Sequence, residues 1–306
     1  MKAAAFSYLR PRHLTEVLHL LSLHGDEARL LAGGQTLLAT LNMRLSEPAL
    51  LIDMQAVSEL KGLRLQGQVL RIGALVTHTE VETSELVATH APMLSAAAPH
   101  IAHRAIRNLG TFGGSIAYGD PAAEWPACLL ALGGVVIARS LRGERRIPAD
   151  DFFTGLYTTE LALDEVIVAC EIPVARAGER FSFSELARRH GDYAVVGLAA
   201  AATLDDGVMS KVRLAWIGVG STPMRSPVAE QALGGQRLTI ESVTRAVDVL
   251  RDELHPIADL THGEAAKRQL ASVLLKRALL GWVHDADAIE DKSFNRLKST
   301  PIQGRP

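Results

Sequence analysis

Cysteine is scarce in this sequence, with only Cys128 and Cys170 among 306 residues. An iron–sulfur cluster is normally held by four thiolates, so this chain cannot build one by itself. Both cysteines stand in apolar stretches, PACLLAL and VIVACEIP. We therefore predict buried, reduced thiols and no disulfide framework.

Long apolar runs are also missing. No stretch approaches the ~20 apolar residues that span a bilayer. The first residues, MKAAAFSYLRPRHLTEV, lack the continuous apolar core of a signal peptide. We therefore expect a cytoplasmic protein with no transmembrane segment. A net charge of −2 gives no global electrostatic reason to bind nucleic acid or an anionic membrane.

Several catalytic signatures are absent as well. The sequence contains no G-x-G-x-x-G, no G-x-S-x-G and no H-E-x-x-H, which argues against Rossmann, hydrolase and metalloprotease functions. His100 and His103 have the spacing of one helical face, but no nearby Cys or Glu completes a recognised metal-ligand set. We assign neither a catalytic residue nor a metal site to this chain.

Length and apolar periodicity predict two domains and a mixed α+β fold. The boundary falls near residues 173–179, where Pro173 and the polar run ARAGER end a strand. The expected elements before it are strands at 28–32 and 49–53, helices at 37–45 and 79–89, a hairpin around Gly67, and an alanine-rich helix over 93–110. Those beyond it are three strands, with a turn at 205–207, and then helices from 226, followed by a polar tail from about 289.

The strongest local motif is Ala32-Gly33-Gly34-Gln35-Thr36, between an expected strand and an expected helix. Adjacent glycines allow backbone N–H groups to approach a phosphate, and the start of a helix adds partial positive charge. This geometry suits a dinucleotide diphosphate. Taken alone, the motif is more often a tight strand-to-helix turn than a ligand site.

A second glycine pair stands in Thr111-Phe112-Gly113-Gly114-Ser115, an expected connection bracketed by two hydroxyl groups. Two such loops in one domain favour a diphosphate site, because a diphosphate has two faces to be bound. Upstream, two interpretations are open for Arg104 and Arg107: they belong to a solvated helix face, or they contact a ligand. Downstream, Asp120 resembles an N-cap followed by Pro121, and Asp120 and Glu124 are either helix-capping charges or ligand contacts.

Three segments in this order resemble the FAD-binding medium subunits of the xanthine dehydrogenase and carbon monoxide dehydrogenase family. They are LLAGGQTLLATLNMRLSEPALLIDM, IAHRAIRNLGTFGGSIAYGDPAAEWPACLLALGG and RRHGDYAVVGLAAA. The resemblance implies a FAD domain of the vanillyl-alcohol-oxidase (PCMH) type over 1–175, with subdomains of about 1–57 and 58–175. It further implies a C-terminal domain over 176–288, with a three-stranded antiparallel sheet and helices, and a flexible tail over 289–306.

The same resemblance implies a set of cofactor contacts. The loops would hold the FAD diphosphate, Asp120 and Glu124 would lie near ribityl or ribose hydroxyls, and Tyr193 would lie beside the isoalloxazine. Tyr193 also has the alternative of packing under its own hairpin. The full set is Leu31, Ala32, Gly33, Gly34, Gln35, Thr36, Thr111, Gly113, Gly114, Ser115, Asp120, Glu124 and Tyr193. Thr36 and Phe112 stand where the family usually has serine and isoleucine.

The function that the resemblance implies is electron transfer. A large partner subunit would carry the molybdenum cofactor, a small one two [2Fe-2S] clusters, and FAD would pass electrons to NAD, oxygen, a quinone or another acceptor. The expected assembly is a heterotrimer, often doubled. Two alternatives stay open from the residues alone: a self-sufficient flavin oxidase of the same fold, and a non-catalytic nucleotide-binding module whose glycine loops are merely turns.

Overall fold

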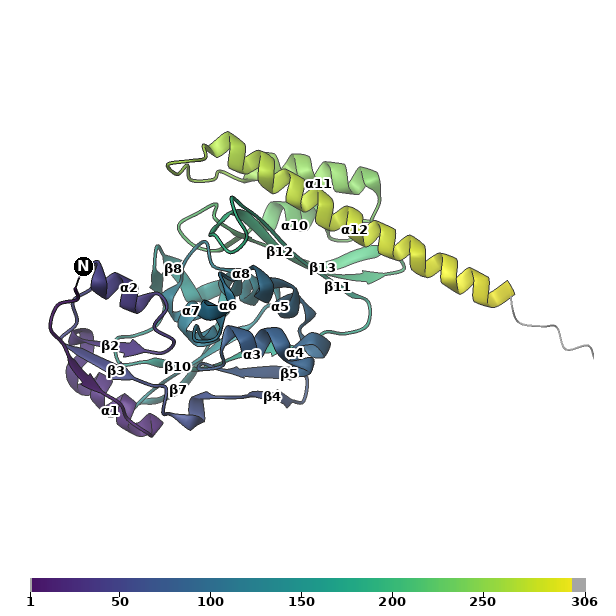
Figure 1. Cartoon of the computed structure of the whole chain (residues 1–306). Helices are drawn as coiled ribbons and strands as arrows, with labels where there is room; N and C mark the ends of the chain where they lie inside the picture. Colours follow the sequence, from purple (N-terminus) through teal and green to yellow (C-terminus); the bar gives the residue numbers. More distant parts are fainter. Residues whose placement is uncertain (1, 299–306) are drawn as a thin grey trace, which may run out of the picture.

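The N-terminal subdomain is a small parallel sheet with one helix packed on it. The computed structural model describes residues 2–298, with side chains described through residue 284. The strands lie in the order β1-β3-β2, and the buried leucines and valine of α1 pack on them (Figure 1). The elements are β1 (Ser7–Leu9), α1 (Leu14–His24), η1 (Gly25–Glu27), β2 (Ala28–Leu31), α2 (Leu37–Asn42) and β3 (Leu50–Asp53).

A five-stranded antiparallel sheet forms the next layer, in the order β4-β5-β10-β6-β7. Its strands are β4 (Leu63–Gln66), β5 (Val69–Gly73), β6 (Val135–Ser140), β7 (Gly143–Pro148) and β10 (Val166–Pro173). Short helices cover it: η2 (Ser58–Leu60), α3 (His78–Thr83), α4 (Glu85–His90), α5 (Pro92–Ala97), η3 (Ala98–His100), α6 (Arg104–Arg107), α7 (Phe112–Tyr118), α8 (Glu124–Ala131) and α9 (Ala149–Phe152). A small hairpin of β8 (Phe153–Gly155) and β9 (Thr158–Thr159) follows α9.

The C-terminal domain is a second antiparallel sheet, in the order β11-β12-β13-β14, with helices on one face. Its strands are β11 (Glu179–Ala187), β12 (Ala194–Asp205), β13 (Val208–Ile217) and β14 (Met224–Arg225). Its helices are α10 (Pro227–Leu233), α11 (Ile240–Glu253) and α12 (Glu264–Lys298). The expected three strands are therefore present, and β14 adds a short fourth strand.

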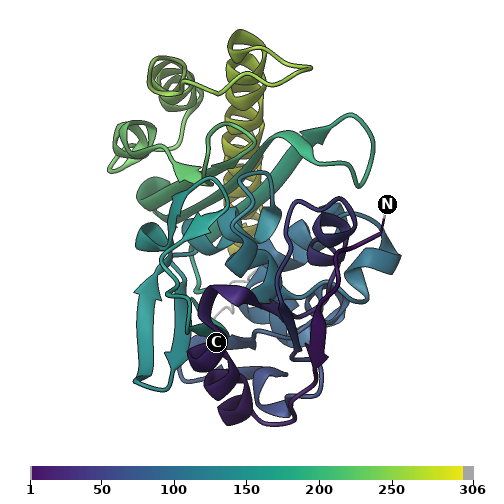
Figure 2. The same ribbon diagram turned by 90° about the vertical axis from the view of Figure 1, so that its left-hand side faces the viewer.

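This C-terminal sheet is buried on both faces, which explains the near-continuous apolar run AVVGLAAAATL. Alternate residues of a strand point to opposite faces, so Ala199 and Ala201 join the core around α8 while Leu198 and Ala200 join the core under α10–α12. The perpendicular view shows the three helices on the far side of the sheet from the N-terminal part (Figure 2). In the described part of the chain, no helix is long and apolar enough to cross a membrane.

Three expected elements differ from the structure. The predicted helix at 79–89 is two helices: α3 is capped by Thr77, not Thr79, in a capping box with Glu80, and α4 is capped by Ser84. The predicted helix over 93–110 breaks into α5, η3 and α6. The flexible tail expected from 289 is helical backbone through Lys298, and residues 299–306 lie outside the described residues.

Two further expectations concern the second glycine motif and Asp120. The pattern predicts a connection at 111–115, whereas in the structure α7 begins at Phe112. The Thr111 side chain caps this helix, since its hydroxyl oxygen accepts from the Gly114 amide. Asp120 is not an N-cap: α8 begins at Glu124, and Asp120 accepts instead from the Ala122 amide at 2.9 Å. Pro121 likewise lies outside α8, and its carbonyl accepts from the Gly218 amide of the C-terminal domain.

Arg213 connects the two domains. Arg213 of β13 donates to the Leu130 carbonyl at the end of α8 at 2.6 and 2.8 Å, and to Asp150 of α9 at 2.8 Å. Its guanidinium therefore satisfies a helix-end carbonyl across the domain boundary.

We predict that Arg213→Met destabilises the chain by about 1–3 kcal/mol, because it removes the hydrogen bonds of a charged group to Asp150 and to the Leu130 carbonyl, which keeps only the Gly133 amide at 3.1 Å. The matched control is Arg142→Met, which removes an exposed pair with Asp164 and should cost under about 1 kcal/mol. The measurement is the urea midpoint of each variant. Equal shifts for the two variants would show that Arg213 contributes no more than a surface charge.

Candidate functional site

The two glycine loops lie against each other in the fold. A Cβ atom added at Gly33 would lie 2.1 Å from the Leu109 carbonyl oxygen and 2.8 Å from the Gly110 Cα. A Cβ at Gly114 would lie 3.7 Å from the Ala32 Cβ. The backbones therefore approach at a distance that only glycine permits at position 33.

The first loop has carbonyl groups that are engaged and amide groups that are not. The carbonyls of Ala32 and Gly33 accept from the side chains of Gln55 and Gln35, and those of Gly34 and Thr36 accept from amides of α2. Within the described residues, the amides of Gly33, Gly34, Gln35 and Thr36 donate to no protein acceptor. Successive open N–H groups form a binding site for an anion.

The second loop is engaged differently. Its amides at Phe112, Gly113 and Gly114 donate to the Val76 carbonyl, the Ala74 carbonyl and the Thr111 hydroxyl oxygen, at 2.8, 3.0 and 3.1 Å. Gly113 serves close packing, since a Cβ there would lie 2.6 Å from Ala74. The donors that this loop retains are hydroxyl hydrogens, because the Thr111 oxygen accepts and its hydrogen stays available.

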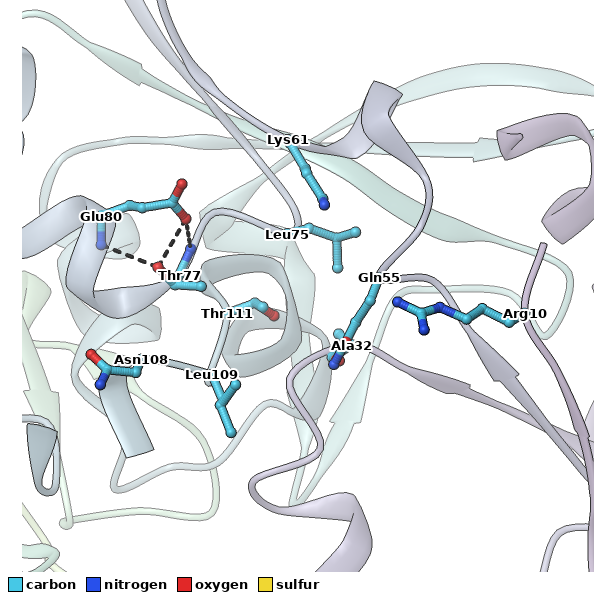
Figure 3. Close-up of a pocket in the computed structure, with 10 residues that line it drawn as sticks. All are labelled: Arg10, Ala32, Gln55, Lys61, Leu75, Thr77, Glu80, Asn108, Leu109 and Thr111. Atoms are coloured by element: carbon cyan, nitrogen blue, oxygen red, sulfur yellow. Dashed lines mark hydrogen bonds between the residues drawn. The ribbon is translucent and has the colours of Figure 1, made fainter. Parts of the chain in front are cut away.

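A cavity of about 430 Å³ opens beside both loops. Its lining residues are Arg10, Ala32, Gln55, Lys61, Leu75, Thr77, Glu80, Asn108, Leu109 and Thr111. Figure 3 shows Arg10 and Lys61 directed inward from different sides, with Lys61 above Ala32 and Thr111 in this view. Two cations and several polar groups around an open space suit a polar, anionic ligand.

Sequence reasoning missed Arg10, Gln55 and Lys61. A signal for the first two was present: Arg10, Ala32 and Gln55 follow the carboxyl ends of β1, β2 and β3, and parallel strands end at one edge of their sheet. Buried Asp53 links Arg10 to Gln55. Its carboxylate accepts from the backbone amide of Gln55 at 2.9 Å and lies 3.4 Å from the Arg10 guanidinium. Gln55 then donates to the Ala32 carbonyl at 3.1 Å.

The remaining expected site residues form a second cluster, beyond the C-terminal end of α7. The Tyr118 and Tyr157 rings lie 5.0 Å apart, and burial raises the pKa of both residues, as does the charge of Asp120. Loss of solvent around the hydroxyl and the same charge raise the pKa of Tyr193 to about 12, although 68% of that residue's surface is exposed. Asp120, Glu124 and Tyr193 are thus brought together, but none of them lines the cavity.

Glu124 is the most perturbed acid of this cluster. Burial, and then the charge of Glu185 on β11, raise the pKa of its carboxyl from the usual 4.5 to about 8. Glu185 in turn lies 3.4 Å from the Nδ1 atom of His100. In the side chains described, no group of three His, Cys, Asp or Glu residues is arranged to hold a metal ion.

Two protein families match the chain. Residues 4–175 match the family described as "FAD binding domain in molybdopterin dehydrogenase", and residues 181–282 match the "CO dehydrogenase flavoprotein C-terminal domain". The chain belongs to the FAD-binding subunits of molybdopterin dehydrogenases. Its cofactor is FAD, and it is a subunit of an oxidoreductase.

Relatives of this FAD-binding subunit align over nearly their full length. The nicotine 6-hydroxylase medium subunit of Paenarthrobacter nicotinovorans is 41% identical, over 92% of this chain and 98% of that protein. A solved carbon monoxide dehydrogenase from Hydrogenophaga pseudoflava superposes with a TM-score of 0.89 at 36% identity, over 91% and 97% of the two chains. Quinoline 2-oxidoreductase from Pseudomonas putida gives a TM-score of 0.87 at 36% identity, over 92% and 98%. The resemblance and the fold class expected from the sequence are therefore confirmed.

Glu124 gives a pH-dependent prediction. Below pH about 4.5 the Glu124 carboxyl is neutral in both the folded and the unfolded chain. Between pH about 4.5 and pH about 8 only the unfolded chain releases this proton. The free energy of unfolding therefore falls as the pH rises through this window. Glu124→Gln removes this effect. In urea unfolding, the variant's stability relative to the parent should increase by about 4 kcal/mol between pH 5 and pH 8.5. A difference that does not vary with pH would contradict the raised pKa.

Proposed function

We propose that the four open amides of residues 33–36 bind the diphosphate bridge of FAD, and that this subunit passes electrons from an iron–sulfur partner to an external acceptor. These amides carry the proposal, since four adjacent donors that bond to no acceptor among residues 2–298 fit a doubly charged diphosphate. Leu31 ends the strand that leads into them. The hydroxyl groups of Thr111 and Ser115 add neutral donors from the opposite loop.

The two halves of FAD would lie at the two ends of α7. The cavity with Arg10, Lys61 and Asn108 suits the polar adenosine half, at the Thr111 end. Asp120, Glu124 and Tyr193 lie toward the other end, about 10 Å along the seven-residue helix. We assign the ribityl or ribose hydroxyls to the two carboxyl groups and the isoalloxazine ring to Tyr193.

The proposed division of labour follows from what this chain contains. Bound FAD supplies the electron-transfer chemistry, while the chain binds the cofactor, orients its ring edge and shields it. Both cysteines are fully buried, which supports placing the [2Fe-2S] clusters on a small partner and the molybdenum cofactor on a large one. We further propose a cytoplasmic heterotrimer, able to double, whose acceptor is NAD, oxygen or a quinone.

A charge substitution tests the diphosphate site. Ala32→Asp places a carboxylate between the two loops, where repulsion by the diphosphate should weaken FAD binding about 100-fold. The control is Ala32→Asn, which has the same shape without the charge and should weaken binding at most about tenfold. The measurement is the FAD content of the purified complex. If the Asp and Asn variants retain FAD equally, the diphosphate does not lie on these loops.

The electron-relay role is tested by rapid mixing of the complex with the substrate that the complex hydroxylates. We expect iron–sulfur absorbance to bleach before the flavin absorbance or together with it, and the FAD-loaded chain without partners to remain oxidised. Flavin reduction by substrate in the chain alone would favour the self-sufficient oxidase instead.

A further inference from the structure

The turn that carries Tyr193 rests on the backbone of the FAD domain. This turn, residues 188–193, joins β11 to β12, and Gly191 within it has a φ of +83°. A Cβ atom at Gly191 would lie 2.8 Å from the Ala102 carbonyl oxygen and 3.0 Å from the His103 ring. The turn therefore touches the 101–103 segment with no room for a side chain.

The supporting segment has an unusual conformation. Ala102 has a φ of +42°, in the left-handed region that non-glycine residues seldom adopt without support from their surroundings. That support is Arg107, whose Nη1 atom donates to the carbonyls of Ile101 at 2.9 Å, Ala102 at 3.0 Å and Pro99 at 3.4 Å. The Ala102 carbonyl thus lies between the Arg107 guanidinium and Gly191.

Arg107 is itself fixed from the other side. Only 8% of the residue is exposed, and its Nε atom donates to the Glu82 carboxylate of α3 at 2.9 Å. Arg104 also pairs with Glu82, at 3.0 Å, but its side chain is 55% exposed. The two arginines therefore differ: Arg104 lies on a solvated face, whereas Arg107 is buried and binds the carbonyls of the 99–102 segment.

We propose that Arg107 is a positioning residue that holds the 188–193 turn through the Ala102 carbonyl, and so fixes Tyr193 beside the flavin. The placement of the turn stands on the contacts above, whereas the link to the flavin rests on the function proposed for Tyr193. A single lysine ammonium cannot take both places of the guanidinium, Nε toward Glu82 and Nη1 toward the three carbonyls, at the same time. The proposal therefore predicts that Arg107→Lys loosens the turn.

The test compares two glycines of equal backbone strain. Gly191→Ala adds a methyl group against Ala102, whereas Gly235→Ala, at a φ of +76° with nothing within 4 Å, adds strain alone. We expect trypsin to cleave after Arg188 and Arg189 roughly fivefold faster in Gly191→Ala and Arg107→Lys than in the parent or Gly235→Ala. Each rate is divided by that of a peptide spanning 185–196 of the same variant, which removes local sequence effects.

A second readout uses iodide quenching of flavin fluorescence in the assembled complex. The proposal expects quenching to change in Gly191→Ala and Arg107→Lys but not in Gly235→Ala. Unchanged proteolysis in Arg107→Lys would overturn the positioning role, whatever Gly191→Ala does. Faster proteolysis with unchanged quenching would show that the turn does not lie beside the flavin. A normal FAD content in the same variants would leave the proposed diphosphate site unaffected. A complex without FAD would defeat the proposed function, yet the proteolysis would still decide the role of Arg107.

Discussion

Four adjacent amides at Gly33 to Thr36, for which the described part of the chain offers no acceptor, are the feature around which the rest of the site is arranged. Engagement of the neighbouring carbonyls with other groups favours such a loop, because a free carbonyl beside the site would repel an anion. Gln55 performs this task for Ala32, and Asp53 holds Gln55 in place. The parallel strands supply the geometry, since their carboxyl ends bring these segments to one edge.

The second constraint is the close contact between segments that are far apart in the sequence. Gly33 lies on the Leu109 carbonyl, Gly113 lies on Ala74, and Gly191 lies on the Ala102 carbonyl. At each point a side chain would push backbone against backbone. These glycines thus fix the first loop against the second, and the C-terminal turn against the FAD domain.

Much of this arrangement is legible in the sequence. Strand-loop-helix patterning located the first glycine motif, the 205–207 turn was placed correctly, and the joint occurrence of three motifs indicated the family. Local patterns failed where tertiary contacts decide. The glycine pair at 113–114 concealed the start of α7, because low helix propensity is offset there by the Thr111 cap and by burial on Ala74. The roles of Arg10 and Arg107 depend on partners distant in the sequence, which periodicity does not report.

The most direct measurement is a crystal structure of the FAD-loaded complex at a resolution that defines the diphosphate oxygens. The account predicts these oxygens at about 2.7–3.2 Å from at least two of the amides of Gly33, Gly34, Gln35 and Thr36. A diphosphate bound elsewhere, with these amides facing water, would contradict the account.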